Sequence, residues 1–538
     1  MSLNKKPKVL LVVVYCGNMI KMYEEAGVSM IAAFLRSYQY EVKIIAQTEK
    51  NIDYDFIAAY SPKIIGFTVY KVSKAVVGRV SLKIREILSD SLLCLGGYEA
   101  SCQAERLLNE MPHIDLCIRG EGEKTFFEVV KAIENAVELD NIEGITFRKG
   151  TSIISNADRR LIEDLDTLPY MSRDILKNNN LHVAQIWTSR GCNGYCTFCI
   201  SETFWKKWRG RSIKNVVDEI EYVKNTYKID TFYFIDGSFE DPDEDCTRLE
   251  NLAQAIIDRD LNIYYMALFR SEFVRKATPK LMELLVKSGL FTAFVGVEAA
   301  NADDLKLFCK RGSLDDSKNI MELFKSYKIG LQLGFILYNP YSKCSNIVKN
   351  IEFLVDNNYV TRFLGYVVLE GTPLSKKIER DGLINSQSFF GYNFQNSYVE
   401  KIIIFINNYL DEITDLKSTY QILNNITNDL IFVYPNILRR CERYQLNEYM
   451  KYMLQYYDQC LSLVSDANYI IGNWLKSLFE IKEAQWDEQD IIEKSQNYWT
   501  NSQLQKIINR LQLKRNKFYM EINSYNIPNI DELTQLII

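Results

Sequence analysis

Residues 188–199 read TSRGCNGYCTFC and contain three cysteines, Cys192, Cys196 and Cys199, in the spacing CxxxCxxC. No fourth cysteine lies nearby. Four thiolates complete a four-iron cluster and make it an electron carrier, whereas three leave one iron with an open coordination position. The triplet therefore predicts a [4Fe-4S] cluster that binds a substrate or cofactor directly. A structural zinc site is the alternative, but such sites usually combine two CxxC-like pairs, and no second pair is present.

The triplet spacing, with Phe198 immediately before the last cysteine, resembles the cluster loop of the radical S-adenosylmethionine (radical SAM) enzymes. In that family the open iron binds the amino and carboxylate groups of SAM, and one electron from the cluster cleaves SAM to a 5′-deoxyadenosyl radical. This radical removes hydrogen from unactivated carbon. The resemblance implies an enzyme with a [4Fe-4S] cluster and SAM as cofactors and an electron donor such as flavodoxin or ferredoxin as partner.

The composition is that of a globular protein. The chain has 538 residues, of which 47% are apolar and 25% charged, which is enough for two or three domains. A net charge of −5 provides no basic field for a polyanion such as tRNA, so a small-molecule or peptide substrate fits better. The apolar run Val9–Tyr15 is too short to span a bilayer. Twelve cysteines without a secretory signal predict a cytoplasmic protein with no membrane association.

Residues 1–150 alternate apolar runs with helical patterns, which is typical of a doubly wound parallel sheet. The predicted strands are 9–15, 41–46, 63–69 and 92–95, and residues 27–38 are one of the predicted helices. Ligands of such sheets bind beyond the carboxyl ends of the strands. We therefore expect a Rossmann-like α/β domain over residues 1–150, followed by a linker over 151–180.

Two glycine-rich turns follow strands of this predicted sheet. LGGYEAS contains Gly96 and Gly97, and RGEGE contains Gly120, Glu121 and Gly122. Glycines there let a bulky ligand approach the backbone. In order and spacing, both turns resemble the cobalamin-binding domain of the cobalamin-type radical SAM enzymes. The resemblance implies that these five residues contact a cobalamin cofactor.

The loop after the first strand, residues 16–27, departs from one pattern of cobalamin proteins because it contains no histidine to serve as a lower axial cobalt ligand. Two interpretations stay open: cobalamin binds without that ligand, or the sheet is vestigial and no longer binds cobalamin. The chain has only two histidines, His113 and His182, and we assign neither a functional role. A histidine-rich metal site is excluded.

Residues 181–385 repeat strand and helix and predict a partial (β/α)6 TIM-type barrel, whose C-terminal rim should hold the chemistry. The six predicted strands are 184–188, 231–235, 264–268, 291–297, 330–337 and 363–368. Later segments, including GTP at residues 371–373, also resemble the family.

Four residues at predicted strand ends match positions that bind SAM in the family. The resemblance implies that Asp236 and Ser238 meet the SAM amino group, although DGSF departs from the commoner Gly-Gly-Glu form. Arg270 would meet the SAM carboxylate, and an arginine simply paired with an acid is the alternative. Glu298, in VGVEAA, would contact the ribose or another part of SAM. Phe198 completes this predicted cofactor-binding set.

Residues 386–538 lose the strand pattern and predict a helical C-terminal domain. This segment has only two cysteines, Cys441 and Cys460, too few for an auxiliary cluster. Substrate enclosure and plain scaffold remain alternatives for it.

Within the barrel, Cys344 follows the fifth strand, where a thiol would return a hydrogen atom to a substrate radical, as a cysteine does in radical SAM peptide epimerases. Cys309 is a weaker candidate for the same role.

We therefore expect a cobalamin-type radical SAM enzyme that modifies an unactivated carbon of a peptide or natural product, with C-methylation as the reaction if cobalamin binds. The first alternative is cobalamin-free epimerisation or rearrangement with Cys344 as hydrogen donor. A tRNA methylthiotransferase is the second alternative, which predicts cluster cysteines in the N-terminal domain. Its candidates lie at strand and helix positions instead: Cys16, Cys94, Cys102 and Cys117. The third alternative, a non-catalytic relic, conflicts with the intact triplet.

Overall fold

The computed structural model describes residues 6–16, 24–242, 244–359, 365–385, 387–388, 390–412 and 414–522. It divides into two compact units. The first comprises Met1–Asn193, Cys199–Gly237 and Leu369–Thr372, and the second Gly194–Phe198, Ser238–Val368 and Pro373–Ile538. This division interleaves segments of the chain, so the expected boundaries at residues 150, 180 and 385 stay a prediction.

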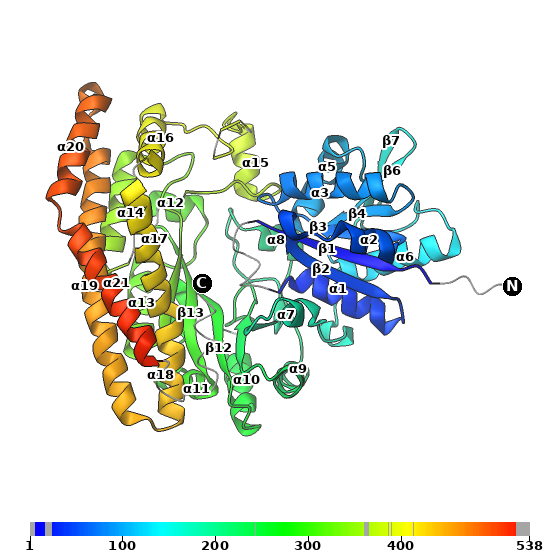
Figure 1. Cartoon of the computed structure of the whole chain (residues 1–538), viewed down its shortest axis with the longest axis horizontal. Coiled ribbons are helices and arrows are strands. Elements are labelled where there is room, and N and C mark those ends of the chain that lie inside the picture. Colours follow the sequence, from blue (N-terminus) through cyan, green and yellow to red (C-terminus); the bar gives the residue numbers. More distant parts are fainter. Residues whose placement is uncertain are drawn as a thin grey trace. The chain divides into compact units, whose positions relative to one another are not determined.

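The first unit contains a seven-stranded sheet in the order β2-β1-β3-β4-β5-β6-β7 with helices on both faces (Figure 1). Strands β1 to β5 pair in parallel and β6 and β7 add an antiparallel edge. The strands are β1 (Val9–Tyr15), β2 (Val42–Thr48), β3 (Ile64–Thr68), β4 (Leu92–Gly96), β5 (Leu116–Ile118), β6 (Ile145–Lys149) and β7 (Ser152–Ser155). The helices are α1 (Ala26–Ser37), α2 (Tyr54–Tyr60), α3 (Lys74–Ile87), α4 (Tyr98–Cys102), α5 (Ala104–Glu110) and α6 (Gly122–Asn135). The predicted Rossmann-like architecture is confirmed.

Burial explains these elements. All seven residues of β1, VLLVVVY, are buried, as expected for a parallel strand covered on both faces. On α3 the buried residues Val77, Val80 and Ile84 recur at helical spacing and join the core beneath the sheet. The sheet therefore presents its carboxyl edge, rather than a face, for ligand binding.

The rest of the first unit carries the start of the predicted barrel. Its elements are α7 (Asp174–Asn178), β8 (Ala184–Ile186), β9 (Ser189–Arg190), α8 (Ile200–Trp205), β10 (Arg209–Gly210), α9 (Ile213–Tyr227) and β11 (Thr231–Phe234). Strand β11 pairs in parallel with β8, whereas β9 and β10 form a two-residue antiparallel ribbon. The cysteine triplet lies on the excursion of the chain between β9 and β10.

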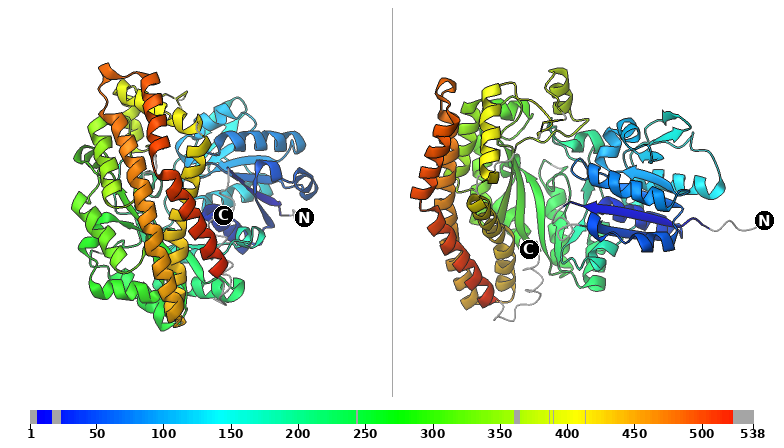
Figure 2. Two further views of the ribbon diagram at one scale, coloured as in Figure 1. Left: turned by 60° about the vertical axis from the view of Figure 1, so that its left-hand side comes forward. Right: turned by 45° about the horizontal axis from the view of Figure 1, so that its top comes forward.

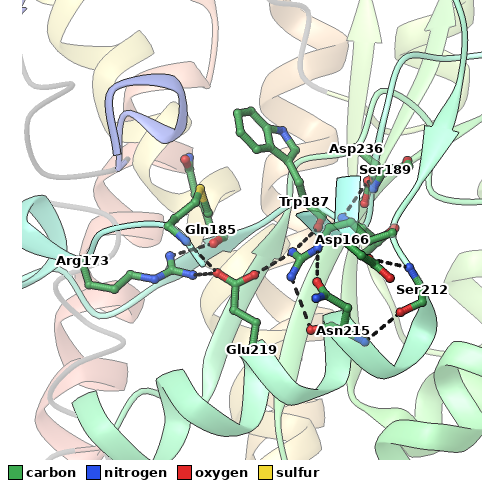
Figure 3. Close-up of polar contacts among 12 residues, drawn as sticks. Asp166, Arg173, Gln185, Trp187, Ser189, Ser212, Asn215, Glu219 and Asp236 are labelled. Carbon is green, nitrogen blue, oxygen red and sulfur yellow. Dashed lines mark hydrogen bonds and ion pairs between the residues drawn. The ribbon is translucent and has the colours of Figure 1, made fainter. Parts of the chain in front are cut away.

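A buried ion network joins helix α9 to the segments that precede α1 and α7. The Arg173 guanidinium lies 2.7 Å from the Glu24 carboxylate and 2.9 Å from the Glu219 carboxylate, as Figure 3 shows for Glu219. Glu219 also pairs with Arg211 at 2.6 Å. Each buried charge has an opposite partner, which is the condition for charges to be tolerated in a core.

The second unit contains the parallel strands β12 (Tyr264–Arg270), β13 (Leu290–Glu298) and β14 (Gly330–Phe335). Its barrel helices are α10 (Thr247–Asp258), α11 (Pro279–Ser288), α12 (Ala302–Leu307), α13 (Leu314–Ser326) and α14 (Cys344–Asp356). The sixth predicted strand, 363–368, is wrong over the part that the structure describes, where Gly365 makes only a single bridge to Tyr338. Tyr366 and Val368 are buried and Val367 is 54% exposed, so the described stretch alternates as a strand does, but it pairs at this one residue and then runs into the turn at Gly371.

The C-terminal helices pack on the outside of the second unit. They are α15 (Pro373–Arg380), α16 (Ser397–Glu412), α17 (Thr414–Asn428), the π-helical η5 (Asp429–Val433), α18 (Tyr434–Arg443), α19 (Asn447–Glu480), α20 (Glu488–Asn501) and α21 (Leu504–Ile522). The long helix α19 runs beside α21 (Figure 2) and packs so closely on α14 that a Cβ at Gly472 would lie 2.2 Å from Val355.

Helices η5 and α18 cover the amino ends of the barrel strands. The Thr292 hydroxyl, near the start of β13, donates to the Ile431 carbonyl at 2.5 Å, and Arg439 of α18 donates to the Leu290 carbonyl at 3.4 Å. Barrel chemistry belongs at the opposite, carboxyl ends. This part of the C-terminal region is therefore scaffold. None of the described helices has the length and apolar content needed to cross a membrane.

Candidate active site

The cysteine loop is held in a tight turn at its start. Gly191 has a φ of +90°, and a Cβ there would lie 2.2 Å from the Lys207 carbonyl oxygen, so only glycine fits. A Cβ on Gly237 would lie 2.9 Å from the Gly191 carbonyl and 3.2 Å from Cys192 Cβ. The segment after β11 thus packs directly on the first cysteine of the triplet.

The three cysteines are half-buried along this loop. Cys199 is the N-cap of α8, and its Sγ accepts from the Ser201 amide at 3.4 Å. Among the described residues, no three histidine, cysteine or carboxylate side chains gather closely enough to hold a single metal ion. In a four-iron cluster each thiolate binds a different iron, so the three sulfur atoms need not meet at one metal ion.

The middle of the loop is anchored to the residues after β13. The Thr197 amide donates to the Phe308 carbonyl at 3.1 Å, and the Thr197 hydroxyl donates to the Leu307 carbonyl at 2.7 Å. The rings of Phe198 and Phe308 meet edge to face with centroids 5.2 Å apart. Phe198 therefore packs as a wedge beside the last cysteine, and its predicted contact with a cofactor stays a prediction.

Asp236 anchors the chain just before the cysteine loop. Its Oδ1 accepts hydrogen bonds from the Thr188 amide at 3.0 Å, from the Ser189 hydroxyl at 2.8 Å and from the Ser189 amide (Figure 3). This buried carboxylate therefore orients the strand that leads to the triplet. The SAM amino group predicted for Asp236 would be a further partner.

Arg270, at the end of β12, is surrounded by acids. Its guanidinium lies 2.7 Å from Asp241, 3.1 Å from Glu240 and 3.4 Å from Glu272. The charge of this arginine is therefore already neutralised, which agrees with the alternative that Arg270 is simply paired with acids. A SAM carboxylate would have to compete with these acids. Ser238, the other predicted contact near this position, is buried.

Glu298 has the most strained backbone among the predicted site residues. Its φ is +70°, at a bulge that ends β13. A non-glycine residue in this region costs about 1–3 kcal/mol, and such strain clusters at functional sites. Burial raises the pKa of Glu298 to about 7, although the nearby Lys310 ammonium opposes the shift. Glu298 thus changes charge near neutral pH.

Lys310 links Glu298 to the cluster loop. Its ammonium lies 3.9 Å from the Glu298 carboxylate and donates to the Gly296 carbonyl at 3.0 Å. Burial lowers the pKa of Lys310, but the Glu298, Cys196 and Glu272 side chains outweigh burial and raise it. A buried cation therefore lies at the end of β13, within electrostatic range of Cys196. The sequence contains Lys310 in the KRG segment that follows Glu298, but only the fold brings this lysine near Cys196.

Glu121, predicted as a cobalamin contact, has a second role at the cluster loop. Arg190 and Arg209 face each other across the β9–β10 ribbon, where like charges repel. The buried Glu121 carboxylate lies 2.7 Å from Arg190 and 2.9 Å from Arg209, and Glu123 pairs with Arg190 at 2.5 Å. The RGEGE turn therefore neutralises the ribbon from which the cysteine loop emerges.

A cavity of about 520 Å³ lies at the carboxyl edge of the seven-stranded sheet. Its lining includes all five glycine-turn residues predicted from the sequence: Gly96, Gly97, Gly120, Glu121 and Gly122. Gly97 has a φ of +96°, and a Cβ there would crowd the Val69 carbonyl at 3.1 Å. The volume is in the range of cofactor sites, and the inner lining of Leu11, Gly66 and Phe126 is apolar. A bulky, largely apolar cofactor fits this cavity.

Sequence reasoning missed the aromatic wall of the cavity. Trp187, Phe204 and Trp205, which flank the cysteine triplet, line it together with Arg190. The Arg190 guanidinium lies 4.8 Å from the Trp187 ring and 5.3 Å from the Trp205 ring. The clustering of aromatic residues around the triplet was visible in the sequence, but nothing there indicated that they face a second site.

The remaining candidates lie elsewhere. Cys344 is the first residue of α14, is half-buried, and has a pKa raised by burial and by Glu483, so it remains a thiol. Cys309 is exposed. His113 lies 2.8 Å from the Ser81 hydroxyl, which is consistent with a structural role.

Two family models match the chain at these sites. Residues 187–342 match the radical SAM superfamily and residues 13–130 match the B12 binding domain. The chain belongs to the radical SAM superfamily, in its B12-binding type. The match to the radical SAM superfamily contains the cysteine triplet, and the match to the B12 binding domain contains the glycine turns. The protein is therefore an enzyme whose cofactors are a [4Fe-4S] cluster, SAM and cobalamin.

Relatives of this radical SAM enzyme include methyltransferases and cyclases. An uncharacterized methyltransferase of Pyrococcus horikoshii is 26% identical over 337 residues, covering 61% of this chain and 72% of the relative. The anaerobic magnesium-protoporphyrin IX monomethyl ester cyclase of Synechocystis is 27% identical, covering 51% of this chain and about half (55%) of the cyclase. The solved structure of the cobalamin-dependent SAM radical enzyme OxsB has a TM-score of 0.71 at 18% identity, covering 99% of this chain and 83% of OxsB. That likeness shows the fold.

A first prediction concerns the triplet. Replacing Cys196 with alanine should abolish the four-iron cluster, because two thiolates cannot hold the cube. Anaerobic reconstitution followed by iron analysis and visible absorbance measures this loss. The matched control is Cys309→Ala, since Cys309 is exposed. A Cys196→Ala protein with the full iron content of the wild type would contradict the assignment.

A second prediction concerns the ion cluster at the ribbon. Glu121→Gln leaves two buried arginines with less counter-charge, which should lower the free energy of unfolding by about 3–5 kcal/mol and reduce cluster content. Chemical denaturation and iron analysis measure the two effects. The same change at Glu163, whose pair with Lys207 is exposed, serves as control and should alter neither. Equal stability of the two variants would show that the Glu121 ion cluster contributes nothing.

Proposed function

We propose that this enzyme transfers a methyl group from SAM to an unactivated carbon of a small natural product or peptide. One observation supports this most: Arg190, the last residue of β9 before the cysteine loop, lines the cavity that would hold the corrin. The methyltransferase of Pyrococcus horikoshii points to the same reaction. When bound, the cluster and SAM supply a hydrogen-abstracting radical, and cobalamin supplies a methyl carrier.

We assign the cofactors to the following residues. Cys192, Cys196 and Cys199 would ligate three irons, and the glycine turns at 96–97 and 120–122 would let the corrin approach the backbone. Glu298 would accept hydrogen bonds from the SAM ribose, with Lys310 positioning its carboxylate from 3.9 Å. Asp236, Ser238 and Arg270 would complete the SAM site, with Phe198 packed beside the cluster.

The substrate would be enclosed by residues 390–396, which cover the carboxyl end of β14. The Gln395 amide donates to the Pro340 carbonyl at 2.8 Å, and the Tyr338 ring lies 5.8 Å from Phe390 and 6.0 Å from Phe394. The Tyr338 and Phe394 rings are buried in this packing, which fixes the segment over the end of β14. An electron donor of the flavodoxin or ferredoxin type would deliver the reducing equivalents.

Methyl transfer has a product signature that separates it from the alternatives. With cluster, cobalamin, a chemical reductant and SAM that carries a deuterated methyl group, we expect both S-adenosylhomocysteine and 5′-deoxyadenosine, and the first only when cobalamin is present. Mass spectrometry of the reaction measures both. Formation of 5′-deoxyadenosine alone, with solvent deuterium entering a product and loss of that label in Cys344→Ala, would replace methylation by epimerisation.

SAM binding should depend on pH through Glu298. Because the pKa of this carboxyl is raised to about 7, it is neutral below that pH and ionised above it. An ionised acceptor binds ribose hydroxyls more strongly, so SAM affinity should rise about tenfold between pH 6 and pH 8. Calorimetric titration of the cluster-loaded protein measures this rise, and Glu298→Gln should remove it. A pH profile that is identical in the variant would remove Glu298 from the SAM site.

A further inference from the structure

A buried polar cluster joins the segments that follow β13 and β14 in the second unit. At its centre is the carboxylate of Asp304, on the first turn of α12. The Asn301 side-chain amide donates to Asp304 Oδ2 at 2.6 Å, and the Asn339 amide donates to Oδ1 at 2.7 Å. Asn350 of α14 donates more weakly to Oδ2 at 3.4 Å. All four side chains are buried, so the cluster is shielded from bulk water.

The partners of Asp304 are neutral amides rather than cations. Within the described part of the chain, no lysine or arginine forms an ion pair with this carboxylate. The neighbouring Asp303 differs, because its side chain is 64% exposed and lies 3.4 Å from the Lys343 ammonium. A carboxylate that is buried without a cation is costly, and it is tolerated only where hydrogen bonds satisfy both of its oxygens. Such a fully bonded network is rigid and fixes one arrangement of the chain.

The cluster ties together the carboxyl ends of two neighbouring strands. Asn350 accepts a hydrogen bond from the Ala300 amide at 2.7 Å and donates to the Leu337 carbonyl at 3.0 Å. Ala300 is two residues beyond Glu298, the last residue of β13, and Leu337 is two residues beyond the end of β14. The segment that follows the strained Glu298 is therefore held in place by the segment that follows the next strand.

Helix α12 extends this fixed arrangement to the cysteine loop. The Asp304 carbonyl accepts from the Phe308 amide at 2.9 Å, at the end of the helix. The carbonyls of Leu307 and Phe308 in turn accept the two hydrogen bonds of Thr197. A helix of only six residues moves as one piece, since its ends share the same hydrogen-bonded turns. A displacement at Asp304 would therefore reach Thr197 and, next to it in the chain, Cys196.

We propose that Asp304 is a positioning residue for the SAM site. Through α12 it sets the place of Thr197 in the cysteine loop, and through Asn350 it holds the segment that follows Glu298. The inference rests on the proposed function, in which SAM binds at the open iron of the cluster and at Glu298. The effect of Asp304 on SAM is indirect, because it acts through these two segments.

Asp304→Asn tests this role. The new amide replaces one acceptor oxygen, so a donor of Asn301 or Asn339 loses its partner and α12 should shift. The affinity for SAM, measured by calorimetric titration of the cluster-loaded protein, should fall about tenfold, as it commonly does when a residue behind a ligand set is changed. Iron content should stay at the wild-type level, because all three cysteines remain. The electron paramagnetic resonance lines of the reduced cluster with SAM should also move, which a loss of stability alone does not produce.

Two further variants separate positioning from a general disturbance. Asp303→Asn makes the same change at the adjacent, exposed residue and should leave both the SAM affinity and the spectrum unaltered. The double variant Asp304→Asn with Asn339→Asp exchanges the carboxylate and the amide, so the hydrogen bond between these positions is kept with its direction reversed. This exchange should restore the SAM affinity and the resonance lines of the wild type.

Unchanged SAM affinity and resonance lines in Asp304→Asn would overturn the inference, and so would a folded exchange variant with weak SAM binding. If Asp304→Asn does not fold, the exchange variant decides, because it should fold and bind SAM as the wild type does. Failure of the exchange variant in either property would then equally overturn the inference. A wild-type protein that shows no SAM binding in calorimetry or in the spectrum of its cluster is a separate outcome, which refutes the proposed function itself.

Discussion

The carboxylate of Glu121, placed between two arginines, is the interaction on which both cofactor regions of the first unit depend. Arg190 and Arg209 oppose each other across a ribbon of only two residues per strand, and without counter-charge their repulsion would open it. Glu121 and Glu123, from the turn after β5, supply that charge in a buried setting where each unmatched ion is costly. The cysteine excursion begins and ends at this ribbon, and Arg190 of the ribbon also lines the cavity at the sheet edge, so this ion cluster positions both.

In the second unit the candidate site residues lie at one end of the strands, and the helices that support the barrel lie at the other. At the carboxyl ends of its strands lie the strained Glu298, the buried Lys310 and the acids around Arg270. At the amino ends, η5 and α18 are bound to the barrel through Thr292 and Arg439. The C-terminal helices that cover the amino ends are therefore scaffold, whereas residues 390–396 lie near the carboxyl end of β14.

Periodicity and spacing predicted most of the fold. The five strands 9–15, 184–186, 231–234, 264–270 and 290–298 lie within a few residues of their expected positions, because buried parallel strands are short apolar runs between helices. The prediction of a sixth barrel strand was wrong, because an apolar run before a glycine turn has the pattern of a strand whether or not a neighbouring strand pairs with it. Site residues were harder. The predicted glycine-turn residues all line one cavity, but Arg270 meets three acids from nearby loops, and the sequence does not reveal such pairings.

By itself, the sequence predicted a four-iron cluster with one open iron, because CxxxCxxC with no fourth thiol nearby depends only on spacing along the chain, and the resemblance of this loop implied the radical SAM class. It also predicted glycine turns such as that at Gly97, where the positive φ and the nearby Val69 carbonyl favour glycine. Only the tertiary structure decided what surrounds these motifs: Lys310 beside Cys196, the tryptophans beside the glycine turns, and Asp304 bound to Asn339. These contacts join residues far apart in the chain, and packing rather than local propensity creates them.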